Sequence, residues 1–126
     1  MSDFLFDGLH HGLGATLDLR LHQQGLIASN LSNVDTPGYK AKVLRFQEAL
    51  GEAFDRIREA DGGFVDASGL LVDELGLEDW VMDDNSVVLE KENGRMVENA
   101  LMYSAVSTGL SKRLALLRFA ASDGRS

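Results

Sequence analysis

Apolar side chains recur at alternating four- and three-residue spacings over the last quarter of the chain. Such a heptad repeat places one stripe along one face of a helix. We therefore predict a helix over residues 86–121, about 50 Å long at about 1.5 Å per residue, with N-cap oxygens supplied by Asp83–Ser86. A single stripe on so long a helix must pack against another element. Its members are Met96, Ala100, Tyr103, Ser107, Leu110, Leu114, Leu117 and Ala121.

The other end of the chain carries a shorter stripe of the same kind. Leu17, Leu21, Gln24, Ala28 and Leu31 are spaced by four and three residues, so they share one face of a helix predicted over residues 8–33. We expect the two terminal helices to pair as a coiled coil. Other apolar side chains fall outside that seam, which predicts surface left over for partners in an assembly. The predicted packing residues are Leu17, Leu21, Ala28, Leu31, Met96, Tyr103, Leu110, Leu114 and Leu117.

The first helix is predicted to end in a tight turn around the only proline. The Asn-Val-Asp-Thr run before this proline contains side chains that compete with helical hydrogen bonds, so the helix should stop near Asn33. Pro37 has a fixed φ and Gly38 tolerates positive φ, which together predict a type II turn over Thr36–Tyr39. Residues 34–46 are expected to contain this turn and an extended segment.

A strongly acidic segment lies between the two helices. Residues 47–92 contain fourteen acidic and three basic residues, a net charge of −11, whereas residues 93–126 contain two acidic and five basic ones. An acidic segment of this kind repels nucleic-acid phosphates, which argues against a nucleic-acid partner. We expect residues 47–84 to be largely irregular, with a short amphipathic helix starting at Phe46 and extended runs at residues 64–65 and 70–72. The expected fold is one mainly α domain over residues 1–126.

The chain lacks the residues that several other classes of protein require. It has no cysteine, so disulfides and thiolate metal sites are excluded. No run approaches the roughly 20 apolar residues of a membrane span, and the N-terminal residues have no basic region of the kind that opens a cleaved signal peptide.

Candidate chemical groups are few. Asp7, His11, Asp18 and His22 form two pairs with i,i+4 spacing, but the pairs lie about two helical turns apart, too far for one metal ion to bind all four. Neither a nucleophile with a partnered base nor a glycine-rich phosphate loop is present. We therefore predict no catalytic, cofactor or metal site, and no enzymatic activity.

Residues 28–40 read Ala-Ser-Asn-Leu-Ser-Asn-Val-Asp-Thr-Pro-Gly-Tyr-Lys. This run resembles the N-terminal signature of the bacterial flagellar rod and hook proteins, A-S-N-x-A-N-x-x-T-P-G-Y-K, and departs from it only at Ser32. The resemblance implies that Asn30, Asn33, Thr36, Pro37, Gly38 and Tyr39 set the turn and contact neighbouring subunits.

A second resemblance narrows the position within that family. Residues 85–92 and 98–103 are similar to the strings N-x-V-x-L-E-x-E and E-N-x-L-x-Y of the proximal rod members, although Val88 replaces a common acidic residue. This implies a structural subunit of the periplasmic flagellar rod that transmits torque and is exported through the flagellar type III apparatus without signal cleavage. Implied partners are other rod proteins, the inner-membrane MS-ring protein and the ring–rod adaptor.

One alternative rests on the same physical features. A soluble, acidic coiled-coil adaptor or export chaperone would also combine an acidic middle segment with surplus apolar helix surface. It would form a stable dimer in solution, and it would not require the turn at Thr36–Tyr39.

Overall fold

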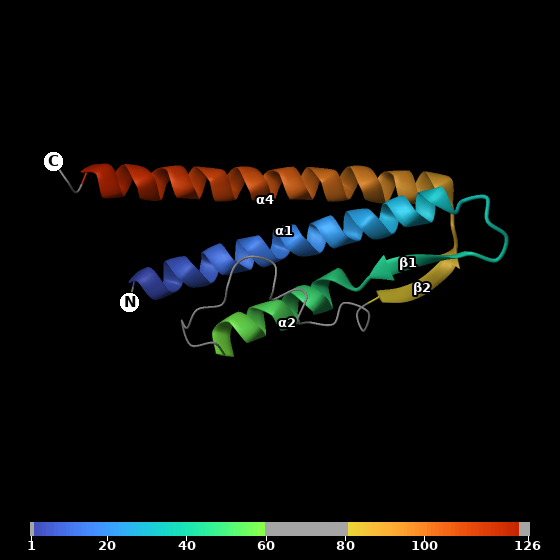
Figure 1. Ribbon diagram of the computed structural model, residues 1–126, viewed down its shortest axis with the longest axis horizontal. Helices are drawn as coiled ribbons and strands as arrows, with labels where there is room; N and C mark the ends of the chain where they lie inside the picture. Colours follow the sequence, from blue (N-terminus) through green and yellow to red (C-terminus); the bar gives the residue numbers. More distant parts are fainter. Residues whose placement is uncertain (1, 60–80, 124–126) are drawn as a thin grey trace.

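The computed structural model of the chain describes residues 2–59 and 81–123. These residues form a mainly helical fold with two long terminal helices, as predicted (Figure 1). The elements in chain order are α1 (Ser2–Ser32), β1 (Lys40–Leu44), α2 (Phe46–Glu59), β2 (Val81–Ser86) and α4 (Leu89–Asp123).

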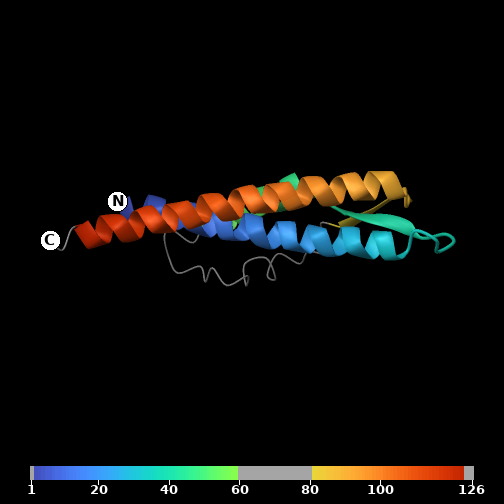
Figure 2. The same ribbon diagram turned by 90° about the horizontal axis from the view of Figure 1, so that it is seen from above.

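The molecule is elongated along its two long helices. Helix α4 runs antiparallel to α1 and crosses it at a small angle, so both chain termini lie at the same end (Figures 1 and 2). Helix α2 packs on α1 from a different side than α4 does, which leaves α1 as the central element. None of the helices in the described part of the chain is long and apolar enough to cross a lipid bilayer.

Strands β1 and β2, which flank the chain between the two long helices, form a short antiparallel sheet. Strand β1 pairs with β2 in a register that places Lys42 opposite Asp83 and Leu44 opposite Val81, with an irregularity between Lys40 and Lys42. The short helix predicted to start at Phe46 is confirmed as α2. The prediction that the rest of residues 47–84 is irregular is wrong at residues 81–84, which belong to β2. The extended runs predicted at residues 64–65 and 70–72 lie outside the described residues.

The predicted N-cap of the C-terminal helix is also wrong. Asp83 and Ser86 belong to β2, and α4 begins at Leu89, with its first helical hydrogen bond from the Glu92 N–H to the Val88 carbonyl at 3.0 Å. The reason is that the backbone of residues 81–86 pairs with the backbone of β1. Pairing with a strand distant in sequence outweighs the local tendency of these side chains to cap a helix.

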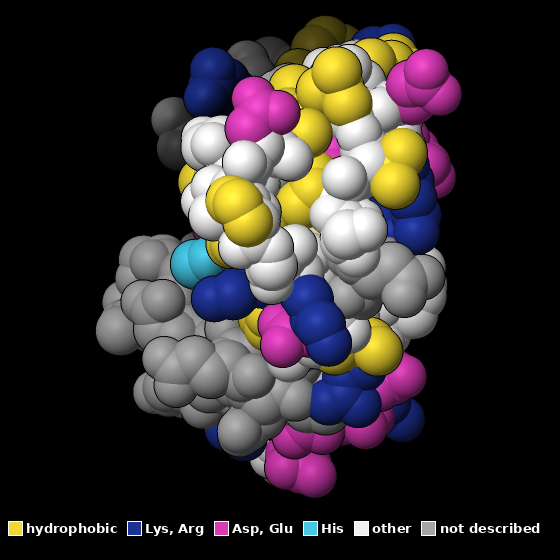
Figure 3. Space-filling model, turned by 90° about the vertical axis from the view of Figure 1, so that its right-hand side faces the viewer, with side chains coloured by type: hydrophobic (Ala, Val, Ile, Leu, Met, Phe, Trp, Pro, Cys, Tyr) yellow, Lys and Arg dark blue, Asp and Glu magenta, His cyan; other side chains and the backbone are white. Residues whose placement is uncertain are grey.

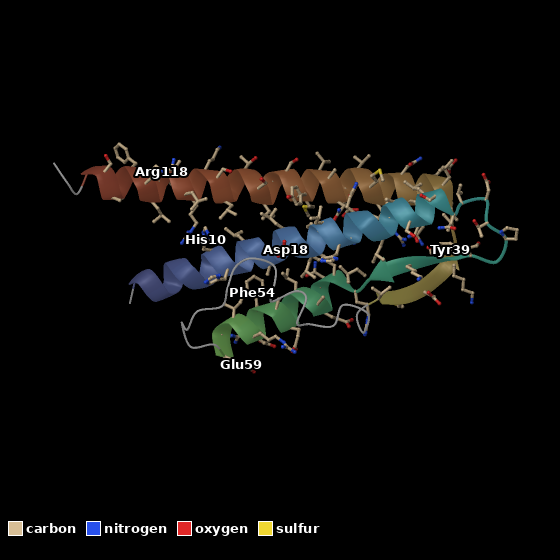
Figure 4. The ribbon with its side chains drawn as sticks, viewed as in Figure 1. His10, Asp18, Tyr39, Phe54, Glu59 and Arg118 are labelled. Atoms are coloured by element: carbon tan, nitrogen blue, oxygen red, sulfur yellow. The ribbon has the colours of Figure 1, made fainter. Side chains whose placement is uncertain are left out.

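The hydrophobic core lies between α1, α2 and β1. One cluster is formed by Leu19, Leu44, Phe46 and Ala49, and a second by Ala15, Ala53 and Ile57. Gly12 permits close approach of the helices, because a Cβ at this position would collide with the ring of Phe54. The labelled Phe54 side chain lies in the space between α1 and α2 (Figure 4).

This core uses the face of α1 opposite to the predicted stripe. Leu19 is completely buried, whereas Leu21 is 60% exposed. At 3.6 residues per turn Leu19 lies about 200° around the helix from Leu17. The prediction that Leu21 and Ala28 pack in a buried seam is wrong within the single chain, because α2 and β1 cover a face that a two-helix pairing leaves open. Leu17 and Leu31 are half-buried.

The predicted packing residues of α4 are not fully buried either. Met96 and Leu110 are half-buried, whereas Tyr103, Leu114 and Leu117 are exposed to between 37% and 42%. No apolar side chain of α4 belongs to the buried core of the described residues. The two long helices therefore pack together, but the fully buried side chains that the described part of α4 contributes are polar, and its apolar residues are half-buried or exposed.

Candidate assembly site

The turn after α1 has the predicted geometry. Helix α1 ends at Ser32, next to the predicted stop. Gly38 has φ +76°, and the Tyr39 N–H donates to the Thr36 carbonyl at 3.2 Å. A hydrogen bond across four residues with positive φ at the third confirms the type II turn.

Side chains of the same motif hold the turn against α1. The Asn33 amide donates to the Ser29 carbonyl at 2.8 Å, and the Thr36 hydroxyl donates to Asn33 Oδ1 at 3.1 Å. The Tyr39 hydroxyl lies 3.3 Å from the Ser29 hydroxyl, and its ring reaches from the start of β1 toward α1 (Figure 4). These bonds leave the tip of the turn, including Pro37 and Gly38, exposed to solvent.

Asn30 connects this turn to the sheet. Its Nδ2 donates to the Lys42 carbonyl and its Oδ1 accepts from the Lys42 N–H, both at 2.9 Å. The amide thus bonds to the edge of β1 as a neighbouring strand would. Asn30 has no exposed surface. The implied contact of Asn30 with neighbouring subunits is therefore wrong, because the side chain is used entirely inside the chain.

A buried carboxylate completes this polar contact. The second hydrogen of Asn30 Nδ2 points to Glu92 Oε2 at 3.1 Å, and Glu92 Oε1 pairs with Arg95 Nη1 at 2.8 Å. Glu92 is only 1% exposed. The sequence pattern did not single out this residue, because a glutamate on a helix is usually exposed to solvent. The second resemblance contained it without indicating that it faces Asn30.

A second polar contact lies one heptad further along α4. Asn99 Nδ2 donates to the Arg20 carbonyl at 2.9 Å and to Gln24 Oε1 at 2.8 Å, and Asn99 is 3% exposed. The Arg20 guanidinium stacks on the Phe46 ring, 3.8 Å from its centroid. Burial lowers the pKa of Arg20, and the charge of Glu98 partly opposes this effect.

Beside this contact the two long helices leave an open groove of about 230 Å³. Two of the predicted packing residues, Leu21 and Tyr103, line it instead of closing it. The groove is lined by Arg20, Leu21, Gln24, Asn99, Ala100, Tyr103 and Ser104.

The described residues contain no group of three histidine, aspartate or glutamate side chains that could hold a metal ion.

Large apolar side chains are exposed along the whole of α4. Leu101, Leu116 and Phe119 are each between 66% and 69% exposed. At the end that carries the turn, hydrophobic side chains also reach the surface among charged ones (Figure 3). Val88 and Leu89, at the start of α4, are half exposed. Many large exposed apolar side chains on one helix are typical of a protein that binds other proteins.

Comparison with known proteins identifies the class. The family model for flagella basal body rod proteins matches residues 14–40, from the middle of α1 through the turn. Together with the relatives of this chain, that match shows a structural subunit of the flagellar basal body rod and does not favour the adaptor or chaperone alternative.

Similarity to individual relatives shows which family of rod proteins the chain belongs to. It is 32% identical to the flagellar basal body rod protein FlgB of Aeromonas hydrophila over 69% of this chain and 72% of that protein. It is 27% identical to FlgB of Bacillus subtilis, over 96% of this chain and 98% of that protein. FlgB of Salmonella typhimurium is 29% identical over 78% of this chain and 81% of that protein. The chain belongs to the FlgB family of rod proteins.

The turn gives a direct test of this site. We expect Gly38→Val to destabilise the protein by about 1–2 kcal/mol, because a β-branched residue resists positive φ, and to reduce motility. Thermal unfolding and swimming in soft agar measure the two effects. Gly51→Val is the control, since this exposed helical glycine has open space around it and negative φ. Normal stability and swimming of Gly38→Val would contradict the role of the turn.

Proposed function

We propose that this protein stands at the proximal end of the rod and polymerises with other rod proteins into the periplasm-spanning driveshaft that transmits torque. The observation that carries the proposal is the exposed apolar surface along α4. Subunits of a helical tube repeat the same contacts between different faces, so each subunit must offer apolar surface that its own chain leaves uncovered.

The remaining parts of the proposal rest on family resemblance. Partners at the base of the rod are the inner-membrane MS-ring protein and the ring–rod adaptor. The subunit reaches the periplasm through the flagellar type III export apparatus without signal cleavage. The exposed turn tip around Pro37 and the exposed side chains of α4 are the surfaces we assign to contacts with neighbouring subunits.

Charge substitution on α4 tests the assembly surface. We expect Leu101→Asp with Phe119→Asp to abolish swimming while retaining the helical circular dichroism spectrum, because both side chains are about two-thirds exposed. Incorporation is measured by immunoblotting basal bodies purified from a strain that carries the variant as its only copy.

The control places one new negative charge away from this surface. Gln47→Asp lies on the exposed side of α2 and should leave swimming and incorporation unchanged. Normal incorporation of the doubly substituted protein would show that α4 does not supply the subunit contacts. Loss of export, detected as absence of the chain outside the cytoplasm, would separate a transport defect from an assembly defect.

A further inference from the structure

The groove between α1 and α4 contains a cation without an ionic partner. Arg20 lines this groove, and in the described part of the chain its guanidinium forms no ion pair with a carboxylate. Its Nη1 donates to the amide oxygens of Gln23 and Asn99 at 3.3 and 3.4 Å, and its Nε has no hydrogen-bond partner. Burial lowers the pKa of Arg20, and the charge of Glu98 in the same chain only partly opposes this. A carboxylate brought into the groove would therefore stabilise the charged guanidinium.

The size and lining of the groove suit a side chain of another protein. Leu21, Ala100 and Tyr103 give it apolar surface, and its volume is about 230 Å³. Pockets that enclose a drug-sized ligand usually measure about 300–1,000 Å³. An apolar side chain with a carboxylate close to it matches both the lining and the cation.

The opposite side of α4 carries this combination. Leu101 lies two residues from both Asn99 and Tyr103, which places it about 160° around the helix from each of them. Leu101 is 67% exposed, and Glu98, three residues earlier on the same face, is also exposed. We call this face the outer stripe. Its members at helical spacing are Glu98, Leu101, Ala105, Lys112, Leu116 and Phe119.

A chain cannot place the outer stripe in its own groove, because the same helix supplies both. Helix α4 turns Asn99 and Tyr103 toward the groove and Leu101 away from it. Only another chain can bring the outer stripe to this groove. Every copy carries both faces, so such a contact joins two different surfaces and can repeat from subunit to subunit, as a helical tube requires.

We propose that the groove receives the outer stripe of a second copy of this chain, with the neighbour's Leu101 entering between α1 and α4 and the neighbour's Glu98 pairing with Arg20. The proposal rests on the rod function proposed above and adds which two faces of adjacent copies meet.

Cross-linking in assembled basal bodies tests this contact, because the chain has no cysteine of its own. A strain without the unmodified chain expresses two forms with different epitope tags. One carries Leu21→Cys in the groove and the other carries Ala105→Cys beside Leu101 on the outer stripe. Purified basal bodies are treated with a short bifunctional thiol reagent and immunoblotted. We expect a dimer of the two forms, and little dimer when either form is present alone or when Gln47→Cys, on the exposed side of α2, replaces Ala105→Cys.

Charge exchange tests the ion pair. We expect Arg20→Glu in the groove form, or Glu98→Lys in the stripe form, to lower the dimer yield about fivefold, the scale of an interaction worth about 1 kcal/mol. Both changes together should restore most of the yield. The cysteines mark which form supplies which face, so the effect of Glu98 on Arg20 within one chain cannot produce this restoration. Glu48→Lys in the stripe form makes the same change at an exposed glutamate of α2 and should leave the yield unchanged.

The other outcomes decide against the proposal. Presence of both forms in the basal bodies without their dimer would overturn this contact and leave the rod function standing, whereas absence of the chain from basal bodies would overturn both. A cross-link from Leu21→Cys to a different rod protein, seen as a band of another mass, would show that a second copy is not the occupant. If Arg20→Glu loses its helical circular dichroism spectrum, Glu98→Lys tests the pair alone, and an unchanged dimer yield again overturns the proposal.

Discussion

Asn30→Asp is expected to lower the free energy of unfolding by about 3 kcal/mol or more, although it only replaces the side-chain amino group by an oxygen. Aspartate has nearly the shape of asparagine but, when ionised, no hydrogen to donate. Both donor bonds of Asn30 Nδ2 would be lost, and the new carboxylate would face the Lys42 carbonyl and Glu92 Oε2 in a site without exposed surface. Leaving a buried hydrogen-bonding group unsatisfied typically costs about 1–3 kcal/mol, and more for a charged group, and this change leaves two such groups.

Urea denaturation followed by circular dichroism measures this loss. Asn33→Asp is the control on the same turn of the chain. Its Nδ2 donates one bond, to the Ser29 carbonyl, its Oδ1 accepts one from the Thr36 hydroxyl that an aspartate would keep, and the side chain is partly exposed. We expect this control to cost about 1 kcal/mol or less, through one lost bond and a new negative charge near a helix C-terminus. Equal losses in the two variants would show that Asn30 has no special role.

Leu19→Ala is the second change with a large expected effect. Leu19 has no exposed surface and packs with Leu44, Phe46 and Ala49 where α1, β1 and α2 meet. Truncating a buried leucine removes apolar contact and leaves a cavity, at a typical cost of about 2–5 kcal/mol. The same denaturation experiment measures the change in unfolding free energy.

Leu21→Ala is the matched control, because it makes the same substitution two residues away. This side chain is 60% exposed at the rim of the groove, so its truncation should change the unfolding free energy by no more than about 0.5 kcal/mol. A cost at Leu21 equal to that at Leu19 would mean that the face of the predicted stripe is packed as tightly as the face that carries Leu19.

The local parts of the structure were predictable because they depend on neighbouring residues. The end of α1 near Asn33 and the turn at Gly38 follow from side chains that compete with helical bonds and from the positive φ that glycine tolerates. The start of α2 at Phe46 followed from its amphipathic pattern. The existence of both long helices followed in the same way from apolar residues at helical spacing.

The buried face of α1 and strand β2 were not predictable on the same basis. Periodicity shows that a helix has an apolar face, but it does not show how many elements cover the helix. Once α2 and β1 lie on α1, Leu19 becomes core and Leu21 becomes surface. Likewise Asp83 appears suited to a helix cap until the backbone of β1 is placed beside it.

The helices, the turn, the lack of cysteine and the family signature of the flagellar rod could all be recognised in the sequence. These properties are encoded in residues close together along the chain. The burial of Glu92 and Asn99, and the exposure of much of the apolar stripe of α4, became visible in the folded chain alone. Glu92 and Asn30 are 62 residues apart in sequence. The energy of a buried polar side chain depends on whether such a distant partner is present, and no local pattern specifies that.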